Sequence, residues 1–388
     1  MNLNKIIKTT LYIVGVFIFQ ELIFRYAYPI PEIKNFDRIN FTYLSLDGNG
    51  LEHSRDRIWE WRSDLDTSHV FSHYMNQYGF RDKEWRVEKT KNKKRALFIG
   101  DSFVEGVMAE QEETIPLAFE KASNNTFETL NGGLLGCGLN AYLQLAADAI
   151  PLFKPDIAFL CIYANDLGKN VPKVPEFYLE PKYYNTLKPR LLEIISQINT
   201  YGSLKSRWSN FSEPYLPAVS NERNPWTNLE DSLKTHVTPK IAAQMKKALL
   251  NPFLTNAIVK EEMYLKEPPN IGETLHFFKY ICKENNTKPV VVYIPSRNQV
   301  SDYYLPFERQ YALSFPDTIS LNTSKYQVHQ QFLKSQSKSL NIEFIDLTET
   351  IRQEETKGNH LYWNYDQHMK AKGYALLGKT IWEKSDKN

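Results

Sequence analysis

Ser102 stands where the sequence predicts a reacting group. The segment Gly100-Asp101-Ser102-Phe103 directly follows an apolar run, residues 96–100, which predicts a strand buried on both faces. Ligands of open α/β sheets bind outside the carboxyl ends of the strands, so a serine in this place suits a nucleophile. A serine hydroxyl needs a base beside it before it can attack. The alternative is an ordinary turn, because Gly followed by Asp-Ser is also good turn chemistry.

A candidate base lies near the carboxyl end of the chain. Asp366 stands two residues before His368, and a carboxylate can fix the tautomer of a catalytic histidine and stabilise its charged form. The alternative is a helix start with Asp366 as its cap and His368 in the first turn. His360 is the near competitor, but its sequence neighbours carry no carboxylate. We therefore predict His368 as the base and Asp366 as the carboxylate beside it.

Two further segments offer hydrogen-bond donors for an oxyanion. Residues 131–138 read Asn-Gly-Gly-Leu-Leu-Gly-Cys-Gly after a predicted strand, and such a turn at a helix start exposes backbone N–H groups. Asn165 follows another predicted strand and offers its side-chain amide. Either segment would serve as an ordinary turn. Their shared position after strands that end at one edge of a sheet favours a joint site.

These four segments, in this order, resemble the blocks of the SGNH/GDSL hydrolase family. The resemblance covers residues 95–167 and 288–388. It implies a flavodoxin-like fold, an ester intermediate on Ser102, and catalysis without a metal or organic cofactor. It also implies an oxyanion hole made by the backbone amides of Ser102 and Gly136 and the side chain of Asn165.

The chain departs from the family pattern in two places. Many members carry Asp three residues before His, where this chain has Tyr365, and Gly before the Asn, where it has Ala164. The shorter Asp–His spacing resembles the branch that O-acetylates alginate and cell-surface polysaccharides. Residues 76–81 (Asn-Gln-Tyr-Gly-Phe-Arg) and 295–300 (Pro-Ser-Arg-Asn-Gln-Val) also resemble membrane-anchored bacterial members.

Alternating strands and helices must position these segments. The patterns at 96–100, 127–130, 156–163, 289–295 and 342–346 predict strands, and helical spacing is found at 139–153, 273–285 and 325–340. A further helix is predicted to open at Thr114, with Pro116 in its first turn. The alternation predicts a parallel five-stranded sheet in a flavodoxin-like three-layer α/β sandwich. Residues 168–272 are too long for a crossover and predict a partly helical insertion, either a lid or packing on the sheet edge.

The amino-terminal residues predict a membrane anchor. Lys5 and Lys8 flank the start of a mostly apolar run, residues 6–24, close to the roughly 20 residues that span a bilayer. Residues 25–29 offer no small-residue cleavage site, which favours an uncleaved anchor over a secretory signal; a surface amphipathic helix is the alternative. The lysines favour a single pass with the catalytic domain outside the cytoplasm, on the periplasmic or extracellular face. The predicted organisation is an anchor at 1–28, an irregular or β-rich arm at 29–94, and a catalytic domain at 95–388.

Bulk properties narrow the function. The chain has 388 residues with a net charge of +2, so no strong field would hold nucleic acid. Its three cysteines are too few for a disulfide scaffold or a thiolate metal site. We predict a serine esterase or acyl-transfer enzyme acting on a small acyl group, such as acetyl, of a cell-surface glycan or another ester. The alternatives are a polysaccharide O-acyltransferase with a membrane acyl-donor partner, and a catalytically idle glycan-binding or assembly protein.

Overall fold

The chain divides into two compact units in the computed structural model. One comprises Met1–Lys34 with Pro175–Ala218, and the other comprises Asn35–Val174 with Val219–Asn388. The structure describes residues 3–22, 58–61, 65–76, 78–135, 137–167, 226–227, 229, 231–235, 237–246, 271–311, 322 and 327–385.

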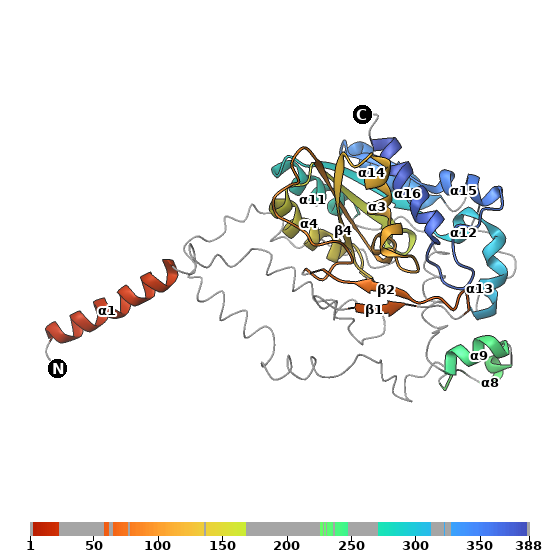
Figure 1. Ribbon diagram of the computed structural model, residues 1–388, viewed down its shortest axis with the longest axis horizontal. Helices are drawn as coiled ribbons and strands as arrows, with labels where there is room; N and C mark the ends of the chain where they lie inside the picture. Colours follow the sequence, from red (N-terminus) through yellow and green to blue (C-terminus); the bar gives the residue numbers. More distant parts are fainter. Residues whose placement is uncertain are drawn as a thin grey trace. The chain divides into compact units, whose positions relative to one another are not determined.

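A parallel five-stranded sheet forms the framework of the second unit (Figure 1). Its spatial order, β4-β3-β5-β6-β7, is 2-1-3-4-5 when the strands are numbered along the chain, and each neighbouring pair is parallel. That order is the flavodoxin-like one. The predicted fold class is therefore confirmed for the sheet, whose strands are β3 (Lys94–Gly100), β4 (Phe127–Gly133), β5 (Ile157–Tyr163), β6 (Lys288–Ile294) and β7 (Glu343–Asp346).

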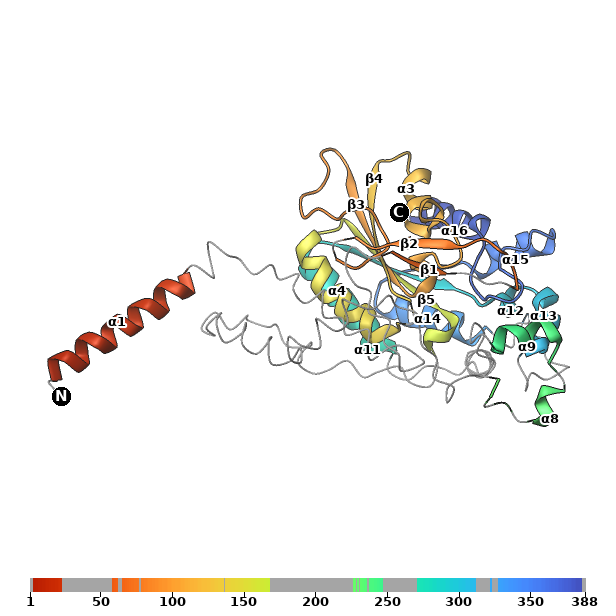
Figure 2. The same cartoon turned by 60° about the horizontal axis from the view of Figure 1, so that its bottom comes forward.

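Helices cover both faces of this sheet (Figure 2). On one face α3 (Ile115–Ala122) packs against α16 (Ala371–Ser385). The other face carries α4 (Leu139–Phe153), α11 (Ile271–Glu284) and α14 (Val328–Ser339). Every residue of β5 is buried, as expected for a strand between two helical layers. Continuous apolar runs rather than alternating ones therefore mark the central strands.

Strand β4 runs further than its apolar residues indicate. We expected a turn from Asn131 onward, but the strand continues through Gly133. A Cβ at Gly132 would lie 2.7 Å from the carbonyl oxygen of Phe98, and one at Gly133 would lie 2.0 Å from the backbone nitrogen of Glu105. Both glycines thus allow close backbone packing, which their lack of side chains hides from an apolar pattern.

Thr114 occupies the N-cap position of α3, as predicted, and Pro116 lies in the first turn. The Thr114 side chain does not cap the helix, however. Its hydroxyl donates instead to the carbonyl oxygen of Gln111 at 3.2 Å, in the short 3-10 helix η4 (Gln111–Glu113).

The described part of the predicted arm contains a small antiparallel sheet. Strands β1 (Ile58–Trp61) and β2 (Phe71–Tyr74) pair with Trp61 opposite Phe71. Much of the predicted insertion lies outside the described residues, but it includes the short helices α8 (Asp231–Lys234) and α9 (Pro239–Lys246). Ile241 and Met245 of α9 pack with Leu65, and Tyr365 packs against the same cluster. This part of the insertion therefore lies beside the segment that carries His368.

The first unit is described only at α1 (Leu3–Leu22), where several apolar side chains, among them Phe17 and Phe19, are exposed. Across the described stretches of the chain, no helix has both the length and the apolarity needed to cross a membrane. The predicted membrane helix is therefore not confirmed.

Candidate active site

Ser102 is the first residue of α2 (Ser102–Glu105), and only Asp101 separates it from Gly100 at the end of β3. The Asp101 carboxylate caps this short helix by accepting the Phe103 N–H at 2.9 Å, and Gly106 ends it with a left-handed φ of 85°. Ser102 is 7% exposed. The strand order reverses between β3 and β5, so Ser102 lies at the switch point where flavodoxin-like sheets bind their ligands.

Asp366 and His368 form the predicted pair. The Nδ1 of His368 lies 2.6 Å from Oδ1 of Asp366, and the backbone N–H of His368 donates to the same oxygen at 2.9 Å. Both side chains are largely buried, at 14% and 12% exposed. With Nδ1 bound to the carboxylate, Nε2 is the nitrogen suited to take a proton from a reacting hydroxyl.

The histidine ring lies next to the helix that carries Ser102. Its centroid is 5.3 Å from that of the Phe103 ring, and Phe103 in turn stacks on Tyr163 at 4.0 Å. Tyr163 is the last residue of β5. The fold thus brings the serine block, the histidine block and the end of β5 close together.

Electrostatics favour a charged His368. Burial by itself would lower the pKa of His368, but the bound Asp366 carboxylate and the more distant Asp101 and Glu105 outweigh it and raise the pKa above its ordinary value. Burial also raises the pKa of Asp101 to about 6, against the opposing effects of the Phe103 N–H and the charge of His368. A developing imidazolium is therefore stabilised at this site.

Asp166 connects the two segments that were predicted to supply oxyanion donors. Its Oδ2 accepts the Tyr163 N–H at 2.9 Å, while its Oδ1 lies 3.0 Å from the hydroxyl of Tyr142. That hydroxyl also donates to the carbonyl oxygen of Cys137 at 3.0 Å. Burial, together with the charge of Asp101, raises the pKa of Asp166 well above its ordinary value.

The donors themselves are described to different extents. Asn165 is half-buried in the 3-10 turn η5 (Ala164–Leu167), directly after β5. Gly136 lies outside the described residues. The predicted oxyanion roles of Gly136 and Asn165 stay predictions.

Arg297, which the sequence did not identify as a functional residue, holds the loop before His368. It is 1% exposed in α12 (Arg297–Val300) and ion-paired with Glu308. Its Nη1 donates to the carbonyl oxygens of Trp363, Asn364 and Asp366 at 2.7, 3.0 and 2.9 Å. The only signal in the sequence was the resemblance of residues 295–300 to family members.

Asp66 binds the same loop from the arm. Its carboxylate accepts the backbone N–H groups of Asn364, Tyr365 and Asp366 at 2.8, 3.0 and 2.8 Å. Arg297 therefore satisfies carbonyl groups of this loop and Asp66 satisfies its N–H groups. The local sequence around Asp66 does not predict this role.

Arg81, in the segment 76–81, makes comparable bonds at the end of α2. Its Nη1 donates to the carbonyl oxygen of Gly106 at 2.5 Å, and its Nη2 donates to those of Ala109 and Ser72 at 2.7 and 3.2 Å. A cation in this position also complements the negative end of a helix. The arm thus supports the helix that begins with the candidate nucleophile.

His360 has no carboxylate among its sequence neighbours, but the fold brings one to it. Its Nδ1 lies 3.0 Å from Oε2 of Glu355, in the last turns of α15 (Thr348–Thr356). The chain turns back after that helix through Gly358, with φ of 81°, and so returns His360 to Glu355. The His360 ring stacks on Tyr303 at 3.5 Å, whereas the His368 ring lies against Phe103 beside Ser102.

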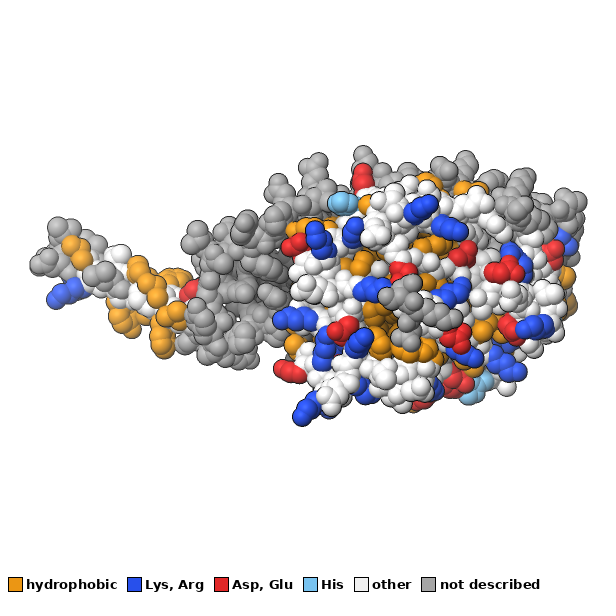
Figure 3. All heavy atoms as spheres, turned by 90° about the horizontal axis from the view of Figure 1, so that it is seen from above, with side chains coloured by type: hydrophobic (Ala, Val, Ile, Leu, Met, Phe, Trp, Pro, Cys, Tyr) orange, Lys and Arg blue, Asp and Glu red, His pale blue; other side chains and the backbone are white. Residues whose placement is uncertain are grey.

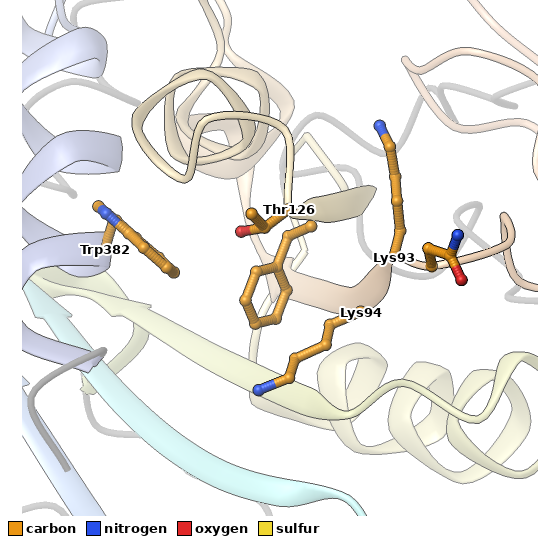
Figure 4. Close-up of a pocket in the computed structure, with 6 residues that line it drawn as sticks. Lys93, Lys94, Thr126 and Trp382 are labelled. Atoms are coloured by element: carbon orange, nitrogen blue, oxygen red, sulfur yellow. The ribbon is translucent and has the colours of Figure 1, made fainter.

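A hollow of about 340 Å³ is lined by residues that include Lys93, Lys94, Thr126 and Trp382 (Figure 4). Lys94 and Phe127 in its lining are the first residues of β3 and β4, whereas Ser102 follows the carboxyl end of β3. The hollow is therefore not part of the candidate site.

On the molecular face drawn in Figure 3, basic and acidic side chains are interspersed.

Comparison with known proteins gives structural likenesses only. No protein-family model matches the chain, and no curated protein matches it. Solved structures to which it is similar include a G-D-S-L family protein from Desulfitobacterium hafniense, with 14% identity and a TM-score of 0.34 over 75% of this chain and 99% of that one. The lipase/acylhydrolase from Enterococcus faecalis matches with 11% identity and a TM-score of 0.36, over 75% and 94% of the two chains.

A catalytic mutant of an acetylxylan esterase from Geobacillus stearothermophilus matches with 12% identity and a TM-score of 0.36, over 76% of this chain and 95% of that one. The matches include the family that the four sequence blocks resemble. All three TM-scores lie below 0.5. The strand order of the sheet, rather than these likenesses, establishes the flavodoxin-like topology.

Proposed function

We propose that this protein is a serine esterase whose nucleophile is Ser102. The observation that carries the proposal is the bonded pair of Asp366 and His368, whose imidazole lies against the residue that follows Ser102 at the switch point of the sheet. Nucleophilic acyl transfer requires a serine with an oriented base within reach, and this pair supplies an oriented, largely buried imidazole beside the helix that Ser102 begins.

The reaction proceeds in two halves. The Ser102 oxygen attacks the ester carbonyl while Nε2 of His368 takes the hydroxyl proton, and the departing alcohol then receives that proton. Water, deprotonated by His368, attacks the acyl-serine, and the imidazolium returns the proton to the Ser102 oxygen as the acid leaves. The backbone amides of Ser102 and Gly136 and the Asn165 side chain are the proposed donors to the oxyanion.

The proposed substrate is a small acyl ester, such as an acetyl group on a cell-surface glycan. The two-residue spacing of Asp366 and His368 resembles that of the polysaccharide O-acetylation branch. This spacing also supports a second candidate, an O-acyltransferase that passes the acyl group from a membrane partner to a glycan.

The test uses the full chain and its Ser102→Ala variant on 4-nitrophenyl acetate and on acetylated xylan. We expect the variant to lose at least about 10⁴-fold in kcat while keeping the thermal unfolding curve of the parent chain. A fluorophosphonate probe should label Ser102 of the parent chain. Near-parental turnover in the folded variant would refute the assignment of Ser102 as the nucleophile. If neither the parent chain nor the variant cleaves the esters, and the probe does not label the parent chain, the result would favour an idle binding protein.

Hydrolase and transferase are separated by adding a glycan acceptor to the same assay. If acyl groups are transferred to the glycan acceptor faster than they are released by hydrolysis, the result would favour the transferase. A location outside the cytoplasm and membrane attachment through the amino-terminal segment are also proposals, supported by Lys5, Lys8 and the exposed apolar side chains of α1.

A further inference from the structure

We infer that Glu105 is a positioning residue. It links the helix that begins with the candidate nucleophile, Ser102, to the loop that contains Gly136, a predicted oxyanion donor. The inference rests on the proposed esterase function. Glu105 is the last residue of α2, which Ser102 begins, and it is fully buried at 0% exposed. A buried carboxylate is unfavourable unless its oxygens are bonded, so its partners show what the burial secures.

Each oxygen of Glu105 binds a different segment of the chain. Oε2 accepts the backbone N–H of Leu135 at 2.8 Å, and Leu135 directly precedes Gly136, the predicted donor. Oε1 lies 2.8 Å from Nδ1 of His73, which comes from β2 and is also 0% exposed. One side chain thus joins the catalytic helix, the arm and the predicted oxyanion loop.

The backbone around this contact is closely packed. A Cβ on Gly133 would lie 2.0 Å from the nitrogen of Glu105 and 2.5 Å from its Cα, so the end of β4 rests directly on α2. The N–H of Leu134 donates to the carbonyl oxygen of Gly100 at 3.0 Å. The loop after β4 is therefore held by the end of β3 at Leu134 and by Glu105 at Leu135.

This geometry has a catalytic consequence. Oxyanion donors act only within about 2.7–3.1 Å of the developing charge. A displacement of about 1 Å lowers the rate by roughly a hundredfold. The bond from Glu105 to the Leu135 N–H therefore holds the loop in register with Ser102.

Two substitutions separate position from charge. Glu105→Gln keeps the length and one acceptor oxygen for Leu135, and its amide can reach His73. Glu105→Asp keeps the charge but withdraws the carboxylate by one methylene. Positioning predicts that Glu105→Asp lowers kcat by about 30- to 100-fold with KM within about threefold, whereas Glu105→Gln stays within about fivefold of the parent chain.

The matched control is Glu128→Asp. Glu128 is 8% exposed and binds Nε of Arg95 at 2.7 Å, but it lies at the amino end of β4, away from Ser102. Shortening it should lower the unfolding temperature and leave kcat unchanged. Parental kcat in folded Glu105→Asp, or equal losses in Glu105→Asp and Glu105→Gln, would overturn the inference.

Hydrogen exchange gives a readout that does not depend on ester cleavage. The Leu135 amide should exchange faster in Glu105→Asp than in the parent chain and in Glu128→Asp, and an unchanged rate would overturn the inference. Parental activity in the Ser102→Ala variant would refute the proposed function without affecting this measurement.

If Glu105→Asp does not fold, the double variant His73→Leu/Glu105→Leu removes both polar partners and the acceptor of Leu135. The same kcat loss is then expected, and parental kcat would overturn the inference.

Discussion

A single carboxylate oxygen of Asp366 binds both the ring and the backbone of His368. Oδ1 lies 2.6 Å from Nδ1 and accepts the His368 N–H at 2.9 Å. Asp side chains commonly accept the N–H two residues further on, and such a turn swings the carboxylate alongside the following side chain. The two-residue spacing, shorter than in many SGNH/GDSL sequences, therefore still places the carboxylate at the imidazole.

His368→Ala should be nearly as damaging as Ser102→Ala, because members of a nucleophile–base unit act non-additively. Asp366→Asn should lower kcat/KM by about 10²- to 10⁴-fold, since it removes the orienting charge but keeps the base. His360→Ala is the matched control, because His360 also binds a carboxylate, that of Glu355. The check is to measure kcat/KM of the three variants on one ester. An inactive His360 variant together with an active His368 variant would show that the assignment of His368 as the base is wrong.

Activity should fall on the acid side as His368 protonates, because only the neutral imidazole accepts the serine proton. The pKa of His368 is raised, so this fall should begin above the ordinary value of about 6.5. Asp366→Asn removes a carboxylate that raises this pKa and should move the acid limb of kcat/KM to lower pH. An acid limb that stays in place would show that another group controls it.

The same shift bears on stability. The pair of protonated His368 and Asp366 stabilises the fold fully below the ordinary histidine pKa, and this contribution disappears as the pH rises through the higher folded-state pKa. Unfolding free energies of the parent chain and Asp366→Asn should therefore differ most at low pH within the range where Asp366 remains ionised.

Asn165→Ala should lower kcat by about 10²- to 10³-fold, the usual loss for one oxyanion donor. KM should change little, because the donor is aimed at charge that appears only in the transition state. Steady-state kinetics on 4-nitrophenyl acetate measure both constants. A large rise in KM with unchanged kcat would make Asn165 a substrate-binding residue instead.

Arg297→Lys should lower kcat by about 10- to 100-fold, because one ammonium group cannot replace a planar guanidinium that binds Glu308 and the loop carbonyls together. Arg95→Lys is the control. Arg95 is equally buried and binds Glu128 and the carbonyl oxygens of Val87 and Phe153 at the other edge of the sheet. Both variants should unfold at lower temperature, but only Arg297→Lys should lose turnover in the folded state. Equal kcat in the two variants would contradict a role for Arg297 in holding the base.

The amino-terminal segment should keep the chain with membranes through a carbonate wash, and a chain lacking residues 1–28 should be released. The apolar run at residues 6–24 motivates this expectation. Fractionation with an antibody to the catalytic unit measures it. Release of the full chain by carbonate would contradict integral attachment, and recovery of a shortened chain would indicate a cleaved signal.

The sequence by itself predicted the strands of the sheet and the pairing of Asp366 with His368. Strands buried on both faces are continuous apolar runs, so β3, β5 and β6 could be located within a few residues from the pattern of apolar residues. Ser102 and His368 were found because each stands in a short block at a predicted strand end or helix start. Local signals of this kind can be read from the sequence because the residues within each block are close together in the chain.

Only the tertiary structure decided what holds those residues in place. Glu105 with His73, Arg297 with the loop before His368, and Asp66 with the same loop are contacts between segments far apart in the sequence. The end of β4 at Gly133 packs closely against the backbone of Glu105, and the carboxylate beside His360 comes from the preceding helix. Such contacts depend on which strand ends meet at one edge of the sheet, and that is settled by the packing of the whole chain rather than by any local spacing.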